Sequence, residues 1–171
     1  MRKPGPPPPD PLACLFERFG GEILGLLIRL THGDRSEAED LTQETFVAAF
    51  QGQAKFSGRV PVRAWLAGIA VRRWRDRQRR PRPKSVPLAL DPPSEERTDQ
   101  SVTQRVVLEQ ALAQLSDSQQ AAILLVLVRG LTYREAADAL GEPEGTIKWR
   151  VSEASKRLRT ILTEFDIEEK P

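Results

Sequence analysis

The segment from 132 to 159 has the residue pattern with the clearest chemistry. It predicts two helices joined by a tight turn, with Ala137 where the helices cross and Gly141 in the turn. Leu140, Ile147 and Val151 are expected to point inward, which completes a helix-turn-helix pattern. The second helix is expected to expose mainly cations and hydroxyl groups, which suit the phosphates and base edges of a major groove. These side chains are Thr146, Lys148, Trp149, Arg150, Ser152, Glu153 and Lys156. The alternative is a helical hairpin in a protein-binding bundle.

A second pattern places polar groups along one side of a predicted helix. Asp40, Gln43, Glu44 and Val47 follow the i, i+3, i+4, i+7 spacing. A carboxylate-rich face with one exposed valine could dock a basic partner helix. The alternative is a solvated acidic face, which is the commoner case for a helix taken at random.

The third pattern is a run of positive charge. Between residues 72 and 84 the chain has eight basic residues and one acid, Asp76. Such a stripe can bind phosphates, although a solvated face would have the same composition. Two tryptophans flank or interrupt this stripe: Trp65 is expected in the core, and Trp74 is expected to be exposed, where it could stack on unpaired bases.

Composition excludes several classes of site. The 171 residues include a single cysteine, Cys14, and a single histidine, His32, so a disulfide or a zinc site with four Cys/His ligands is not expected. We expect no metal, no cofactor and a cytoplasmic location. The apolar stretch from Leu12 to Leu30 is broken by charges, and the N-terminus lacks the pattern of a signal peptide. Membrane insertion and export are therefore not expected.

The elements that must position these residues are all helical. Helices are predicted over 12–30, as one helix or a kinked pair, over 36–50 with a Ser36–Glu39 capping box, and from Val62 into the arginine run. Further helices are predicted from 102, from 116 and 132 with Ser116–Gln119 and Thr132–Glu135 boxes, and from Pro143 to about Phe165. No segment alternates like a strand. The prediction is an all-α chain with a disordered proline-rich tail (1–11), a domain (12–82), a flexible linker (83–101), a second domain (102–165) and a tail (166–171).

Together these segments resemble a known family. "SEAEDLTQETFVAAF", "KFSG", "WLAGIAVRRWRDRQRR" and "LTYREAADALGEPEGTIKWRVSEASKRLR" look like an extracytoplasmic-function (ECF) sigma factor, the smallest class of the bacterial sigma-70 family. The similarity extends over nearly everything from Leu12 to Leu162. It implies that the first domain is sigma region 2 and the second is sigma region 4.

The resemblance implies roles for the first domain. Asp40, Gln43, Glu44 and Val47 would bind the clamp helices of the polymerase core. The loop after this helix and the helix from Arg63 to Arg80 would bind the minus-ten element, where a base is flipped out and the strands melt. The implied minus-ten residues are Lys55, Phe56, Ser57, Arg59, Arg63, Arg72, Arg73 and Arg75. The family usually has Asn at the position of Arg72.

In the second domain, the resemblance implies that the helix-turn-helix reads the minus thirty-five duplex. Lys148, Trp149 and Ser152 would face the bases, and Thr146, Arg150 and Ser155 would contact the backbone. Glu153 and Lys156 belong to the same surface. The family often has a small or basic residue in place of Trp149 and a basic one in place of Glu153, which implies a changed promoter preference.

The function expected is that of a dissociable initiation subunit without catalysis of its own, whose partners are RNA polymerase core, promoter DNA and an anti-sigma factor. No small-molecule substrate is expected. Two alternatives stay open at this point. A helix-turn-helix regulator that is not a polymerase subunit would leave the acidic helix and the arginine stripe without a role. A helical enzyme is the weakest reading, because His32 has no evident catalytic partners.

Overall fold

The structure is a computed structural model, which describes residues 11–52, 56, 58–79, 106–108 and 110–168. Within these residues there are helices and turns but no β-strand, as the all-α prediction requires. The predicted linker at 83–101 and the N-terminal tail up to residue 10 lie outside the described residues.

Three helices form the N-terminal half: α1 (Pro11–Leu30), α2 (Arg35–Gly52) and α3 (Val62–Gln78). The first is one continuous helix, not a kinked pair. Leucines from all three helices are buried in the common core, including Leu27, Leu41 and Leu66. Burying such side chains removes their apolar surface from water, which is the main stabilising term in folding.

The start of α2 differs from the prediction. Asp34, not Ser36, caps this helix: its Oδ1 accepts a hydrogen bond from the backbone N–H of Glu37 at 2.9 Å, and its carbonyl accepts from Ala38 at 3.0 Å. Ser36 lies inside the first turn. Asp and Ser are both good N-cap residues, and Asp34 precedes Ser36 by two positions. The positive φ of His32 and Gly33 turns the chain so that Asp34 reaches the cap position.

Of the two tryptophans of α3, Trp65 packs against the core as predicted, whereas the prediction for Trp74 is wrong. Trp74, expected to be exposed, is buried with 1% of its surface accessible. Trp65 is partly buried, packs against the core and contacts the Phe56 ring with centroids 4.8 Å apart. Trp74 follows Ala67, Ala70 and Val71 at helical spacing, so it continues the buried stripe into the arginine run.

The C-terminal half begins with helical residues 106–108 and 110–113. It continues with α5 (Asp117–Ile123), the π-helix η2 (Leu124–Val128), α6 (Tyr133–Leu140) and α7 (Glu144–Glu168). Both capping boxes predicted here are confirmed: Ser116 with Gln119, and Thr132 with Glu135. The π-helix was not predicted, because apolar spacing does not distinguish it from an α-helix.

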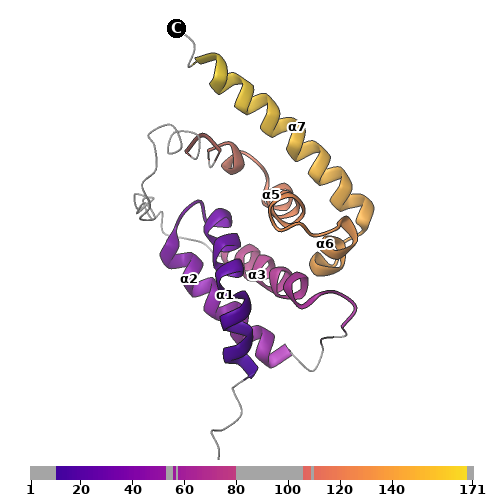
Figure 1. The fold of residues 1–171 in the computed structure, drawn as a ribbon. Coiled ribbons are helices and arrows are strands. Elements are labelled where there is room, and N and C mark those ends of the chain that lie inside the picture. Colours follow the sequence, from indigo (N-terminus) through magenta and orange to yellow (C-terminus); the bar gives the residue numbers. More distant parts are fainter. Residues whose placement is uncertain (1–10, 53–55, 57, 80–105, 109, 169–171) are drawn as a thin grey trace, which may run out of the picture.

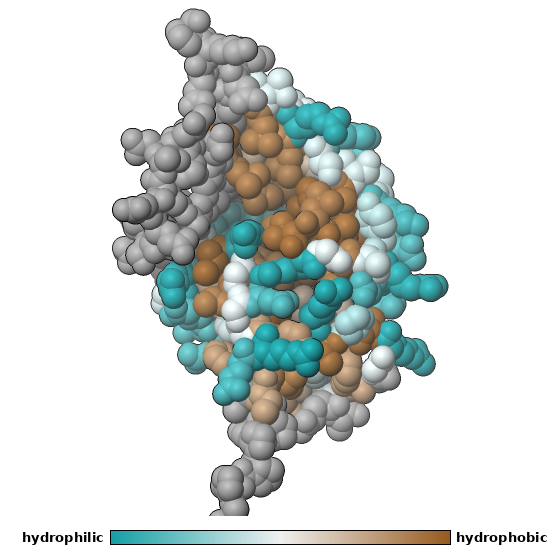
Figure 2. All heavy atoms as spheres, viewed as in Figure 1, coloured by the Kyte–Doolittle hydropathy of each residue, from teal (hydrophilic) through white to brown (hydrophobic). Residues whose placement is uncertain are grey.

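The two halves pack against each other. In Figure 1, α6 lies between α3 and α7, and α3 and α6 are in contact. One cluster of buried residues runs through both halves. In the view of Figure 2, hydrophobic residues gather beside α5 and α7, while hydrophilic side chains cover much of the N-terminal half.

The turn between α6 and α7 depends on Gly141, which has φ 67° and caps α6 in the left-handed conformation. Gly141→Ala should lower the free energy of unfolding by about 1–2 kcal/mol, because an L-residue is strained in this region. A Cβ at this position meets no atom within 4 Å, so the cost comes from backbone conformation and not from a clash. Urea denaturation of the full chain measures it.

Gly145→Ala is the matched control, since Gly145 lies in the first turn of α7 without a positive φ and also has open space at its Cβ. This variant should be neutral or slightly stabilising, because alanine has the higher helix propensity. Equal losses in the two variants would contradict the role given to Gly141.

Candidate functional site

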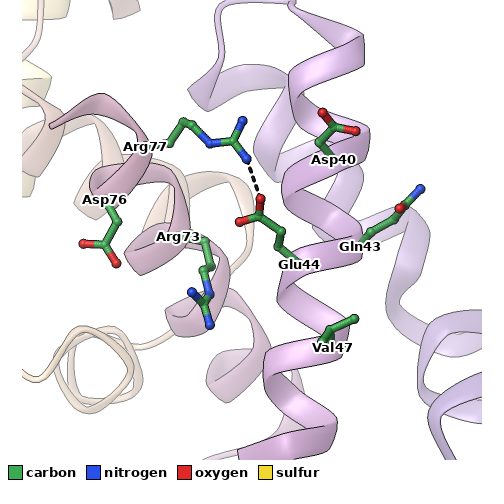
Figure 3. A pocket seen from close by; sticks show the side chains of 7 residues that line it. All are labelled: Asp40, Gln43, Glu44, Val47, Arg73, Asp76 and Arg77. Atoms are coloured by element: carbon green, nitrogen blue, oxygen red, sulfur yellow. Dashed lines mark hydrogen bonds and ion pairs between the residues drawn. The ribbon is translucent and has the colours of Figure 1, made fainter. Parts of the chain in front are cut away.

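The first candidate surface is a groove of about 540 Å³ between α2 and α3. Figure 3 shows the polar face of α2 on one side of it and the end of α3 on the other. The α2 residues predicted to share a face all line this groove. They are Asp40, Gln43, Glu44 and Val47. All four side chains are exposed, and Val47 retains 50% of its accessible surface.

The opposite wall of the groove carries both charges. It consists of Arg73, Asp76 and Arg77 of α3. Arg77 Nη2 donates to Glu44 Oε1 at 2.5 Å, which ties the two walls together. Sequence reasoning had placed Arg73 with the minus-ten residues and had missed Asp76 and Arg77 here, because the pairing of α2 with α3 is tertiary. The groove therefore presents charged groups of both signs and the exposed Val47 side chain to a partner.

The second candidate surface comprises the residues predicted to bind the minus-ten element. Arg59 and Arg63 are exposed and Phe56 is half-buried against Trp65. Lys55 and Ser57 lie outside the described residues. The structure therefore brings Phe56 close to the start of α3, with the arginines nearby along the chain.

The remaining arginines of α3 face the C-terminal half instead. Arg72 Nη1 donates to the carbonyl of Ala139 at 2.7 Å, and Arg75 Nη1 pairs with Glu142 Oε1 at 3.2 Å. Loss of hydration lowers the pKa of Arg72, and neighbouring Arg73 lowers it further, whereas Asp76 acts in the opposite direction. Within the described part of the predicted stripe, Arg73 and Arg77 thus line the α2–α3 groove, whereas Arg72 and Arg75 contact the C-terminal half.

The third candidate surface is the helix-turn-helix of α6 and α7. Ala137, Leu140, Ile147 and Val151 are buried, as predicted. Among the predicted recognition residues of α7, Lys148, Trp149, Ser152 and Lys156 are exposed. Thr146, Arg150, Glu153 and Ser155 are half-buried. The predicted recognition residues therefore share one helix, but they differ in how much of each side chain is exposed to solvent.

Local interactions orient several of these side chains. Lys148 Nζ pairs with Glu144 at 2.8 Å and lies 5.9 Å from the centre of the Tyr133 ring. The hydrogen bond from Lys148 lowers the pKa of Glu144, and the backbone N–H of Thr132 lowers that of Glu135 in the α6 cap. Both carboxylates are therefore charged at neutral pH, and the Glu144 carboxylate holds Lys148 in an ion pair.

Arg150 is held more tightly than Lys148. It pairs with Glu142, whose side chain is 18% exposed. Glu142 thereby contacts both Arg150 and Arg75. Glu142 was not singled out from the sequence, because one of its partners is 67 residues away and no local pattern marks the pair.

Comparisons with known proteins agree with this arrangement. Residues 15–83 match the Sigma-70 region 2 family, and residues 105–158 match Sigma-70, region 4. The chain is 32% identical over 162 residues to the ECF RNA polymerase sigma factor SigL of Mycobacterium tuberculosis, with 91% of each chain covered. The chain belongs to the ECF sigma factors of the sigma-70 family. This confirms the family predicted from the sequence.

Solved structures show that this ECF sigma factor also shares the family fold. The sigma factor RpoE in complex with the anti-sigma factor NepR from Bartonella quintana superimposes with a TM-score of 0.72 at 28% identity, covering 88% of this chain and 96% of that one. CnrH in complex with the cytosolic domain of CnrY gives 0.66 at 25% identity, covering 90% and 88%. The all-α fold with sigma regions 2 and 4 is therefore established for this chain.

Two further findings concern the described part of the ECF sigma factor. None of its helices there combines the length and apolarity that a membrane span requires. The same residues contain no group of three or more His, Cys, Asp or Glu side chains arranged to hold a metal ion.

Proposed function

We propose that this ECF sigma factor divides its work among the three surfaces. The α2–α3 groove binds a helix of the polymerase core, the Phe56 loop and α3 bind the minus-ten element, and α7 reads the minus thirty-five duplex. The observation that carries the proposal is that Asp40, Gln43, Glu44 and Val47 are exposed together along one groove, where carboxylates and one apolar side chain can contact a basic partner helix.

Combining two DNA-binding regions with one polymerase-binding groove gives the protein avidity. Once one surface is bound, the others bind at a high effective concentration, so no surface needs high affinity alone. The protein would contribute binding and strand separation in the cytoplasm, while the polymerase would supply the catalysis. No observation favours the alternative of a regulator that acts without the polymerase.

We further propose that an anti-sigma factor regulates the chain. RpoE was solved with an anti-sigma factor and CnrH with the cytosolic domain of CnrY. Both resemble this chain over 88–90% of its length. A similar partner would cover surfaces from both halves.

Reconstituted transcription tests the proposed function. Core RNA polymerase from the source cell is incubated with genomic DNA fragments, with and without the purified chain, and the 5′ ends of the transcripts are sequenced. We expect new start sites that share two upstream elements and require the chain. A chain that binds DNA but yields no new start sites would contradict the proposal.

Readout by α7 gives a separate prediction. Lys148, Trp149 and Ser152 lie on its exposed side, whereas Arg150 points toward Glu142. Lys148→Ala should reduce the preference for cognate over mutated minus thirty-five duplexes by about 1–3 kcal/mol, which is roughly 5- to 150-fold. Arg150→Ala should weaken binding to both duplexes and reduce the salt slope by about one, as for a phosphate contact.

Binding to matched and mismatched duplexes at two salt concentrations measures both effects. Because Arg150 also pairs with Glu142, its variant is compared by thermal denaturation to separate lost contact from lost stability. If Lys148→Ala weakened both duplexes equally, Lys148 would be a phosphate contact and not part of the sequence readout.

A further inference from the structure

Trp149 of α7 is large and mostly apolar, yet 61% of its surface is exposed. Successive residues of an α-helix lie about 100° apart around its axis. Ile147, Val151 and Ala154 form the buried stripe of α7, so Trp149 lies on the opposite side of the helix. Lys148 lies about 100° to one side of it. The side chain at the centre of the exposed face is therefore the indole and not the cation.

The surface beside Trp149 leaves room for a close approach. Long side chains on a helix extend over the preceding turn, and the residue one turn before Trp149 is Gly145. A Cβ at position 145 would meet no atom within 4 Å, so the space on this side of the helix is open. Trp149 also lies within the first two turns of α7, and the N-terminal residues of a recognition helix are those that contact base edges. The indole therefore lies where a base can reach it.

The polar groups around Trp149 favour a base edge over a phosphate. Lys148 Nζ pairs with Glu144 Oε1 at 2.8 Å, and Lys156 Nζ pairs with Glu153 Oε1 at 2.8 Å. Glu153 lies one turn after Trp149, so its carboxylate repels a phosphate placed against the ring. A base edge has no net charge, and a carboxylate can accept a hydrogen bond from cytosine N4. A protein partner, by contrast, needs a contiguous apolar patch, whereas these neighbours of Trp149 are charged.

We propose that Trp149 contacts the C5 methyl group of a thymine in the minus thirty-five duplex and thereby selects a T·A pair at that position. The inference rests on the proposed readout of this duplex by α7. Among the four bases, thymine alone carries a methyl group in the major groove. The exposed ring covers this methyl and removes it from water, which stabilises the complex. The selection depends on the apolar surface of the ring and not on its Nε1–H group.

Replacing thymine by deoxyuridine tests the contact at a single group, because uracil lacks the C5 methyl but pairs with adenine in the same way. The probes are promoter fragments identified by the transcription experiment, with each thymine of the upstream element replaced in turn. Their binding to holoenzyme reconstituted from the full chain and core polymerase is measured. Replacement at one position should weaken binding about fourfold, the ratio expected when one buried methyl group is lost.

Three variants assign this difference to Trp149. Trp149→Ala should abolish the fourfold difference, because it removes the ring. Trp149→Phe should keep it, because an aromatic ring remains and only the N–H donor is lost. Leu127→Ala is the matched control, since Leu127 is also apolar and 61% exposed but lies in η2, and it should keep the difference. Circular dichroism checks that each variant folds.

Failure of this inference is distinguishable from failure of the proposed function. Equal binding of thymine and deoxyuridine fragments at every position by wild type would overturn the methyl contact. A difference that persisted in Trp149→Ala would assign the methyl to another side chain and indicate that the exposed ring binds a protein instead. Loss of the difference in Trp149→Phe as well as in Trp149→Ala would contradict the role of the apolar surface. If the chain directed the polymerase to no promoter, the proposed function would fail and this inference with it.

Discussion

Replacing Trp74 by alanine should lower the free energy of unfolding by about 3–5 kcal/mol, the range for large-to-small changes of a buried aromatic residue. Trp74 is among the largest fully buried side chains, and it lies on the same stripe of α3 as Ala67, Ala70 and Val71. Its removal leaves a cavity between helices that cannot close without moving the α3 backbone. Urea denaturation of the full chain, followed by circular dichroism, measures the loss.

Trp74→Phe distinguishes the effect of losing the ring volume from the effect of losing the indole N–H group. The indole Nε1 is buried and has no hydrogen-bond partner among the described residues, so its loss removes a group that is costly to bury. The phenylalanine variant should therefore retain most of the stability that alanine loses. A loss below about 1 kcal/mol for Trp74→Ala would show that the site is solvated, in conflict with its 1% exposure.

Reversing the charge at Asp40 should weaken binding to core polymerase by about 30-fold or more, corresponding to at least 2 kcal/mol for a charged contact buried at an interface. Asp40 is exposed in the α2–α3 groove, and Arg73 and Arg77 also line that groove. Asp40→Arg adds a third cation there, which repels a basic partner helix. The measurement is equilibrium binding of the labelled full chain to purified core polymerase.

Glu39→Arg is the matched control for Asp40→Arg. Glu39 is the preceding residue, is exposed and pairs with Arg35 at 2.8 Å, and it does not line the groove. It carries the same charge change on a different face of α2. Its effect on core binding should be small, and both variants should keep wild-type affinity for a minus thirty-five duplex. Equal weakening by the two substitutions would point to a general charge effect and remove Asp40 from the groove's binding set.

Much of the fold was predictable because its signals are local. The two capping boxes, at Ser116 and Thr132, each involve residues three positions apart, and both formed as expected. The buried side of the helix-turn-helix followed from apolar spacing alone. The α2 face was also predictable, since helical geometry fixes which residues lie together.

The features that the sequence did not predict depend on tertiary packing and not on local sequence. Trp74 was placed in solvent because arginines surround it in sequence, although long basic side chains can leave a helix at one side while an apolar stripe continues on the other. The Glu44–Arg77 and Arg75–Glu142 pairs join residues 33 and 67 positions apart, and nothing in either local sequence specifies the partner. Gly68 of α3 is another such case, because a Cβ there would meet the backbone of Ala139 in α6, which no local sequence pattern indicates.

The continuity of α7 affects how genetic data on promoter choice should be read. This helix has 25 residues, and buried Val151, Ala154 and Ile161 share it with exposed Lys148 and Trp149. It therefore acts as a rigid lever: Lys148 lies about 20 Å along the axis from Ile161, and a tilt of about 10° about that end moves it by about 3 Å. Such a shift exceeds the tolerance of a hydrogen bond. Substitutions at packing positions far from DNA can therefore alter promoter preference. A screen of α7 variants for promoter specificity would report on how this helix packs as well as on which of its side chains contact DNA.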